Sequence, residues 1–282
     1  MRPSAARAAL GAVLLTFTAG SQAQTVVSKV ERVPPPALVT VSTPLAVGVE
    51  ADVYCSGWVG EANEKFPGSI FSAERVDNQR SYIEADLLYL DIGTDNGVEA
   101  GQEYWLVRPE RLVYKFGSVI NVLGRVYRTP GRVRVICAQE QAAIAEIVLS
   151  CGEAEVGDLI LPFEPVPIPL VRRTRPLTSC DGPTQKVVGH IVDVRDAITP
   201  LSTDTIVYID LGEKDGLNPG DFLTVYRIGP SSFAAYGDAR RRSDVRTILG
   251  EMAILTTKSN TSVGIITSMK DTMLVGDFAE MK

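Results

Sequence analysis

An internal repeat constrains the fold of this chain more than any other feature of its sequence. Residues 88–93 read Leu-Tyr-Leu-Asp-Ile-Gly, and residues 207–212, which lie 119 positions further along, read Val-Tyr-Ile-Asp-Leu-Gly. Five of the pairs aligned at this spacing are glycine on glycine, where about 0.5 would be expected by chance over about 75 positions. The chain therefore contains two copies of one unit. The aligned pairs are Gly93–Gly212, Gly97–Gly216, Gly101–Gly220, Arg108–Arg227, Gly131–Gly250, Ile147–Ile266, Gly157–Gly276 and Asp158–Asp277.

Each copy has the sequence pattern of a small all-β domain. Apolar side chains at positions 88, 90 and 92 alternate with more polar ones, as in a half-buried strand, and positions 207, 209 and 211 repeat the pattern. Asn96-Gly97 and Asp215-Gly216 then favour tight turns, because glycine adopts positive φ without steric cost. We expect further strands at 103–108, 132–137 and 143–149, at 222–227, 251–256 and 262–268, after 158 and 277, and at 68–71 and 189–192. The predicted fold is all-β, with two tandem small barrels or sandwiches.

Proline-rich segments separate and precede the two copies. Residues 162–169 alternate proline with other residues, which favours an extended, semi-rigid linker because proline cannot donate to a sheet. Residues 25–50 hold four prolines and are expected to form an extended arm. The predicted organisation is a signal peptide at 1–23, an arm at 24–51, a first β-domain at 52–162, a linker at 163–185 and a second β-domain at 186–282.

The first residues have the pattern of a secretion signal. Arg2 and Arg7 precede an apolar run at 8–17, and Ser21-Gln22-Ala23 fits the rule for a cleavage site with small residues. An uncleaved N-terminal anchor is the alternative. Removal of the two arginines would leave 26 basic against 34 acidic residues, a net charge of −8. This charge argues against nucleic acid or an anionic membrane as a partner bound by bulk charge. We expect an exported, periplasmic or envelope protein that does not span the membrane after cleavage.

The chain has four cysteines, at positions 55, 137, 151 and 180. In an oxidising compartment an even number of cysteines indicates disulfides, and four allow three pairings among which spacing does not choose. No two cysteines lie two to four residues apart, and His190 is the only histidine. We therefore predict no zinc site and no other metal.

The motifs of the two copies resemble those of a known group of proteins. The run 54–58 (Tyr-Cys-Ser-Gly-Trp), the strand at 88–93 with Gly97 and Gly101, and Ser150-Cys151 with Gly157-Asp158 form one half of the resemblance. The copy from Val207 to Asp277 forms the other half. Together they resemble the C-terminal region of bacterial LysM-containing envelope proteins, most of them uncharacterised. The single unit also resembles the C-terminal β-domain of flagellar H-ring assembly proteins.

This resemblance implies a disulfide and a cellular neighbourhood. In the LysM-containing group, a cysteine before the first unit occurs together with one at its last turn, which implies a Cys55–Cys151 bond and leaves the pairing of Cys137 and Cys180 open. Those proteins carry a LysM module ahead of the repeats. Here only about 30 residues separate the signal from Cys55, too few for that module. The resemblance implies a cell-wall neighbourhood and does not by itself imply direct glycan binding.

No catalytic constellation is evident in the sequence. A hydrolase needs a nucleophile, a base and an orienting group within hydrogen-bond reach, and no nucleophile elbow, phosphate loop or dinucleotide motif is present. His190 lies at an expected strand start and is interpreted as a half-exposed strand residue. Asp158 and Asp277 follow glycine at equivalent turns, where a carboxylate fixes the corner by accepting backbone hydrogen bonds. We predict no catalytic residue and no cofactor.

Two variable loops, expected at 109–130 and 229–248, are the candidate contact sites. The second contains the basic run Arg240-Arg241-Arg242, interpreted either as a grip for an acidic partner or as a solvated loop tip. The first contains Tyr114, Phe116 and Tyr127, interpreted either as a contact surface or as rings that fold onto the barrel.

These observations predict a non-enzymatic envelope protein that binds partner proteins through its loops or strand edges. A carbohydrate-binding module for peptidoglycan is the alternative. It requires exposed aromatic rings, for which Trp58 and Trp105 are the candidates, although we expect Trp105 to pack in the core. An envelope hydrolase has no supporting motif.

Overall fold

The computed structural model describes residues 45–75, 79–171, 175–229 and 245–282. Strands dominate these residues, and their single α-helix, α1 (Glu50–Tyr54), has five residues. The all-β prediction is therefore confirmed. In the described residues no helix is both long enough and apolar enough to cross a membrane. The predicted signal peptide, at 1–23, lies outside the described residues.

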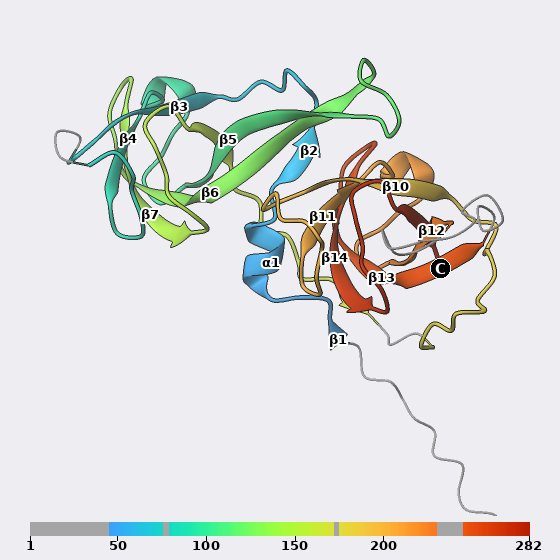
Figure 1. The fold of residues 1–282 in the computed structure, drawn as a ribbon. Helices are drawn as coiled ribbons and strands as arrows, with labels where there is room; N and C mark the ends of the chain where they lie inside the picture. The colour runs from blue at the N-terminus through green and yellow to red at the C-terminus, as the bar shows by residue number, and fades with distance from the viewer. Residues whose placement is uncertain (1–44, 76–78, 172–174, 230–244) are drawn as a thin grey trace, which may run out of the picture. The chain divides into compact units, whose positions relative to one another are not determined.

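The first copy forms a closed six-stranded barrel (Figure 1). All neighbouring strands are antiparallel, and pairing of β6 with β7 and of β3 with β8 closes the ring. A short strand, β2 (Trp58–Gly60), adds to the outer edge of β6. In ring order the strands are β3 (Gly68–Ala73), β4 (Leu87–Leu90), β7 (Ala143–Ser150), β6 (Val122–Ala138), β5 (Glu103–Tyr114) and β8 (Leu159–Pro162).

The second copy repeats this barrel strand for strand. The sequence pattern did not distinguish a barrel from a sandwich, and the structure has a closed barrel in both copies. The turn after the second strand of each barrel is a short 3-10 helix, η1 (Thr94–Asn96) or η2 (Glu213–Asp215), that ends on a left-handed glycine, Gly97 or Gly216. In ring order the strands are β10 (Val188–Val194), β11 (Ile206–Ile209), β14 (Ser262–Met269), β13 (Arg246–Thr257), β12 (Phe222–Ile228) and β15 (Phe278–Met281).

Alternation places one apolar set inside each barrel. Leu88, Leu90 and Leu106 are fully buried in the first core, and Val207, Ile209 and Leu223 are fully buried in the second. A third apolar cluster joins the outer side of β2 and β5 to the outer side of β11, β13 and β14. The chain from Ser42 onward is one compact unit.

The interval 109–130 is a long β-hairpin, so its prediction as a loop was wrong. Strand β5 continues to Tyr114 and β6 begins at Val122, so only residues 115–121 form the turn. Register shifts after Leu106, Pro109 and Val113 interrupt the regular alternation that sequence analysis detects. Of the second interval, residues 230–244 lie outside the described part of the chain, and the end belongs to β13.

The predicted arm and linker also contain short elements. β1 (Leu45–Ala46), in the arm, pairs with β9 (Leu170–Val171), in the linker, as a two-stranded sheet. Helix α1 begins at Glu50, where the carboxylate of Asp52 accepts a hydrogen bond from the backbone N–H of Val49. In the described residues, the arm therefore ends in the first turn of a helix, and the linker contributes a strand to a small sheet.

Candidate functional site

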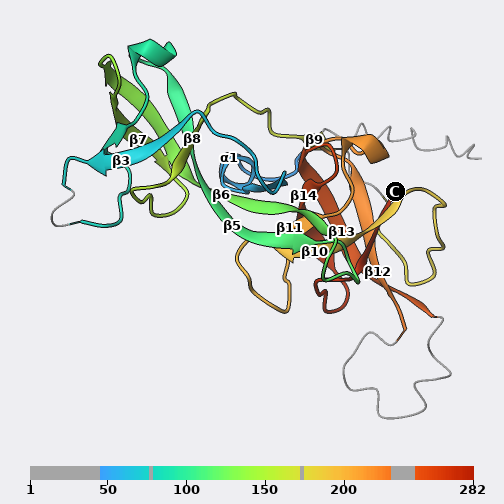
Figure 2. The ribbon, with the colours of Figure 1, turned by 90° about the horizontal axis from the view of Figure 1, so that it is seen from above.

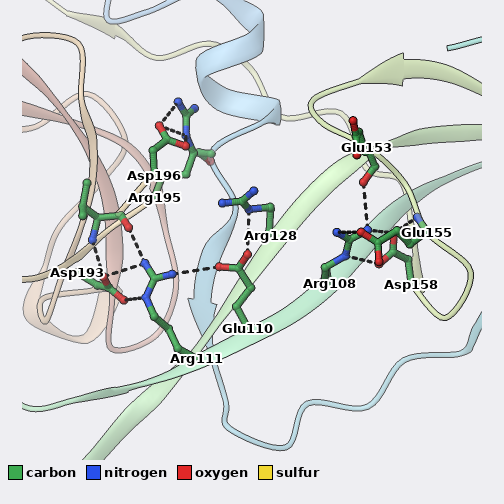
Figure 3. A network of polar contacts seen from close by, with 12 residues as sticks. Arg108, Glu110, Arg111, Arg128, Glu153, Glu155, Asp158, Asp193, Arg195 and Asp196 are labelled. Carbon is green, nitrogen blue, oxygen red and sulfur yellow. Dashed lines mark hydrogen bonds and ion pairs between the residues drawn. The ribbon is translucent and has the colours of Figure 1, made fainter. Parts of the chain in front are cut away.

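A buried ion pair closes the same corner in both barrels. Arg108 Nε lies 2.6 Å from Asp158 Oδ1, and Arg227 Nε lies 2.6 Å from Asp277 Oδ1. Figure 3 shows the first pair, with Glu155 beside it. Each aspartate also accepts a backbone N–H from three residues earlier. These carboxylates therefore fix the turn before the last strand, and the hydrogen bonds from Arg108 to Asp158 raise the pKa of the Arg108 guanidinium.

A second pair of aspartates holds the first strand of each barrel. Asp91 accepts the backbone N–H of Ser69, and Asp210 accepts the backbone N–H of His190. In both barrels the contact lies beside a register shift in the first strand pair. Each aspartate therefore satisfies a backbone donor near that irregularity.

His190 packs between two phenylalanine rings. Its ring centroid lies 4.4 Å from that of Phe116 and 4.7 Å from that of Phe278, and its Nδ1 lies 3.4 Å from Asp210 Oδ2. In the part of the chain that the structure describes, no three His, Cys, Asp or Glu side chains gather closely enough to hold a metal ion. The surroundings of His190 are those of a packed strand residue.

The β5–β6 hairpin lies along β10 of the second barrel (Figure 2). Arg111 donates from Nε and Nη2 to the carboxylate of Asp193, at 2.8 and 2.9 Å, and from Nη2 to the carbonyl of Val194. Glu110 lies between Arg111 and Arg128 and pairs with both (Figure 3). The hydrogen bonds to Asp193 raise the pKa of Arg111. This network holds the hairpin against the second barrel.

The turn of the hairpin exposes apolar side chains. Val119 is 87% exposed and Ile120 is 80% exposed, the two highest values among the large apolar residues described. Sequence analysis did not select Arg111, Val119 or Ile120. The signal that could have found them was two adjacent β-branched residues between Ser118 and Asn121, a place where turn residues are usually polar.

The structure separates the three aromatic residues predicted in this interval. Tyr114 is 39% exposed, and Phe116 is half-exposed with one face on His190. Tyr127 is buried, and its hydroxyl donates to the carbonyl of Glu61. Tyr127 is therefore a core residue, and its interpretation as part of a contact surface was wrong, because its ring packs against Trp58 of β2. Arg240, Arg241 and Arg242 lie outside the described residues.

Trp58 and Trp105 are both buried, which removes the exposed platform that sugar stacking requires. Trp58 stacks on Tyr127 with centroids 5.5 Å apart, and Lys258 Nζ lies 5.2 Å from its ring centroid. Trp105 packs against Tyr54 and Phe163, as expected for a core residue. A cavity of 540 Å³ lies beside the two indoles, but neighbouring side chains occupy the ring faces.

The disulfide implied by the resemblance is present. Cys55 and Cys151 are bonded, with 5.3 Å between their Cα atoms, whereas Cys137 and Cys180 are free and exposed. The bond anchors the segment that connects α1 to β2. The carbonyl of Ser56 in this segment and that of Val59 in β2 accept hydrogen bonds from Tyr208 and Thr261 of the second barrel.

No protein-family model matches this chain, and comparison with curated protein sequences found no match.

Proposed function

We propose that the chain is a non-enzymatic structural or interaction protein of the bacterial cell envelope, located in the periplasm. Its two barrels form a scaffold, and loops that extend from them bind partner proteins of an envelope assembly. The observation that carries this proposal is the β5–β6 hairpin, which extends beyond its own barrel and exposes an apolar turn.

The repeated carboxylates support an architectural rather than catalytic role. Asp158 and Asp277 each bind an arginine and a backbone donor, and each lies in the turn immediately before the last strand of its barrel. Their geometry is the same in both copies, as expected of groups that specify the barrel.

The disulfide supports an oxidising location. Disulfides form and persist in secreted and periplasmic proteins and are rare in the cytosol. The Cys55–Cys151 bond fits export by the predicted signal peptide at 1–23. The envelope assembly itself is an expectation from the resemblance to LysM-containing and H-ring proteins.

Site-specific photo-crosslinking in cells tests the proposal. Tyr114 would be replaced by a photoreactive phenylalanine, with Phe71, exposed at 52% on the first barrel, as the matched control position. We expect discrete protein adducts from position 114 that are absent from position 71 and that recur with the purified partner. Identical adducts from both positions, or none from either, would contradict the proposal.

Purified cell-wall sacculi provide the competing test. Retention of the purified protein on sacculi without other proteins would favour the carbohydrate-binding alternative instead. Retention only in the presence of the crosslinked partner would agree with a protein-binding function.

A further inference from the structure

The hairpin turn exposes a group of apolar side chains. They lie in or beside the turn of residues 115–121, between Tyr114 and Val122, which are opposite each other in the last strand pair. Burial of such side chains away from water is favourable by about 25 cal/mol per Å². The five members and their exposed fractions are Tyr114 (39%), Phe116 (52%), Val119 (87%), Ile120 (80%) and Val122 (42%). We call these five residues the hairpin tip.

The backbone of the turn satisfies many of its own hydrogen-bond donors. The N–H of Lys115 donates to the carbonyl of Asn121, and the N–H of Ser118 donates to the carbonyl of Lys115. The Ser118 hydroxyl oxygen accepts the N–H groups of residues 120 and 121. The backbone donors of residues 115, 118, 120 and 121 are thus paired inside the turn. This property lowers the cost of moving a backbone segment into an apolar medium, where water cannot pair it.

The charge around the tip is opposite to that of the whole chain. Residues 109–130 carry four basic side chains and one acidic side chain, a net charge of +3, whereas the chain carries −6. Two of the four, Arg111 and Arg128, bind carboxylates. Arg125 donates to the carbonyls of Ala62 and Glu110, and Lys115 is exposed at the tip. Lys115 therefore lies within the apolar turn, and Arg125 lies on β6, three residues after Val122.

The tip is held in place by the second barrel. The Phe116 ring stacks on His190 and also lies close to Gly276, where an added Cβ would lie 2.6 Å from Phe116 Cε2. The Arg111–Asp193 pair fixes the hairpin further back. A tip fixed in this way loses little conformational entropy when it binds a surface.

From these observations we propose that the hairpin tip enters the interfacial region of a lipid bilayer. Val119 and Ile120 would lie among the acyl chains, and Lys115 and Arg125 would lie at the level of anionic headgroups. A bilayer accepts exposed apolar side chains on a turn without a complementary groove. The inference rests on the proposed function only in treating this hairpin as the contact element, and it names lipid where that proposal names proteins.

Vesicle flotation tests the inference with the natural protein, purified from the compartment where it accumulates. The vesicles would be phosphatidylcholine alone or phosphatidylcholine with one quarter phosphatidylglycerol. We expect binding to both, stronger on the anionic vesicles. The double variant V119D/I120D should bind more weakly, by about tenfold or more. The charge-matched control I83D/I136D changes two exposed residues of the first barrel and should bind like the natural protein.

Insertion itself is measured with I120W. Because Trp58 and Trp105 are buried, quenching by brominated phosphatidylcholine should report the new indole. Natural protein that does not float, equal flotation of V119D/I120D and the control, or an unquenched I120W would each overturn the inference. Equal binding to both vesicle types would overturn the role assigned to the two cations. Lipid-free crosslinking from position 114 tests protein docking separately, so either proposal can fail while the other stands.

Discussion

The two barrels share a skeleton but differ in what covers one outer face. On the second barrel, outward side chains of β11, β13 and β14 are buried against the first barrel. The equivalent side chains of β4, β6 and β7 are half-buried or exposed. The aligned pairs, second barrel first, are Ile206–Leu87, Tyr208–Tyr89, Ala253–Arg134, Leu255–Ile136, Val263–Ile144 and Ile265–Glu146.

This difference shows how a repeat diverges when its copies meet different environments. The inward positions stay apolar in both copies, because each barrel needs its own core. The outward positions become uniformly apolar or amphipathic only where another domain excludes water. Arg134 and Glu146 occur where the face of the first barrel is in contact with solvent.

The largest expected effect concerns the disulfide, which only the first barrel has. The double variant C55S/C151S opens a bond between residues 96 positions apart and should lower the free energy of unfolding by about 4 kcal/mol. Denaturant unfolding followed by tryptophan fluorescence measures the loss, and hydrogen exchange should assign most of it to β2–β8. The control C137S/C180S should change stability by less than about 0.5 kcal/mol. Equal loss of protection in both barrels would contradict the assignment.

The corner ion pairs should contribute equally to the two barrels. The side chains of Asp158 and Asp277 are only 3% and 4% exposed. Asp158→Ala or Asp277→Ala therefore leaves an arginine and a backbone N–H without their buried carboxylate partner. We expect each variant to lower the free energy of unfolding by about 3 kcal/mol. The exposed Glu84→Ala is the control, with an expected change within about 0.5 kcal/mol. A loss confined to one variant would show that the corners are not equivalent.

The smallest expected effect separates the covered face from the open one. Tyr208 donates to the carbonyl of Ser56 at 2.7 Å in a buried site, whereas Tyr89 is half-buried on the open face. Tyr208→Phe should therefore lower the free energy of unfolding by about 1–2 kcal/mol, and Tyr89→Phe should leave it nearly unchanged. Similar losses from both variants would contradict the difference between the faces.

The same variant predicts a change in pH dependence. Burial raises the pKa of Tyr208 well above its usual value of 10.0. The folded protein then keeps a proton that the unfolded chain loses, so stability is constant below pH 10.0 for this group and falls above it, by up to about 1.4 kcal/mol per pH unit. Tyr208→Phe should flatten that fall, as measured by denaturant unfolding between pH 8 and 11. An unchanged slope would show that Tyr208 does not titrate with unfolding.

Sequence patterns anticipated the elements whose cause is local. The glycines at 97 and 216 require positive φ, and alternation at 88–92 and 207–211 predicts which side chains enter each core. The Cys55–Cys151 bond came from resemblance rather than from spacing. The hairpin was missed because Pro109 and the register shifts near it break the period of two.

The sequence by itself determined that this chain has two all-β units with glycine corners and matching acids, because turn chemistry and strand alternation depend on neighbouring residues. Only the tertiary structure decided which outer face is covered, that Trp58, Trp105 and Tyr127 are internal, and that Val119 and Ile120 are external. Leu-Tyr-Leu and Val-Tyr-Ile have the same local pattern, yet Tyr89 meets solvent and Tyr208 meets Ser56. Burial of an outward side chain depends on the domain that packs against it, and strand alternation does not encode that contact.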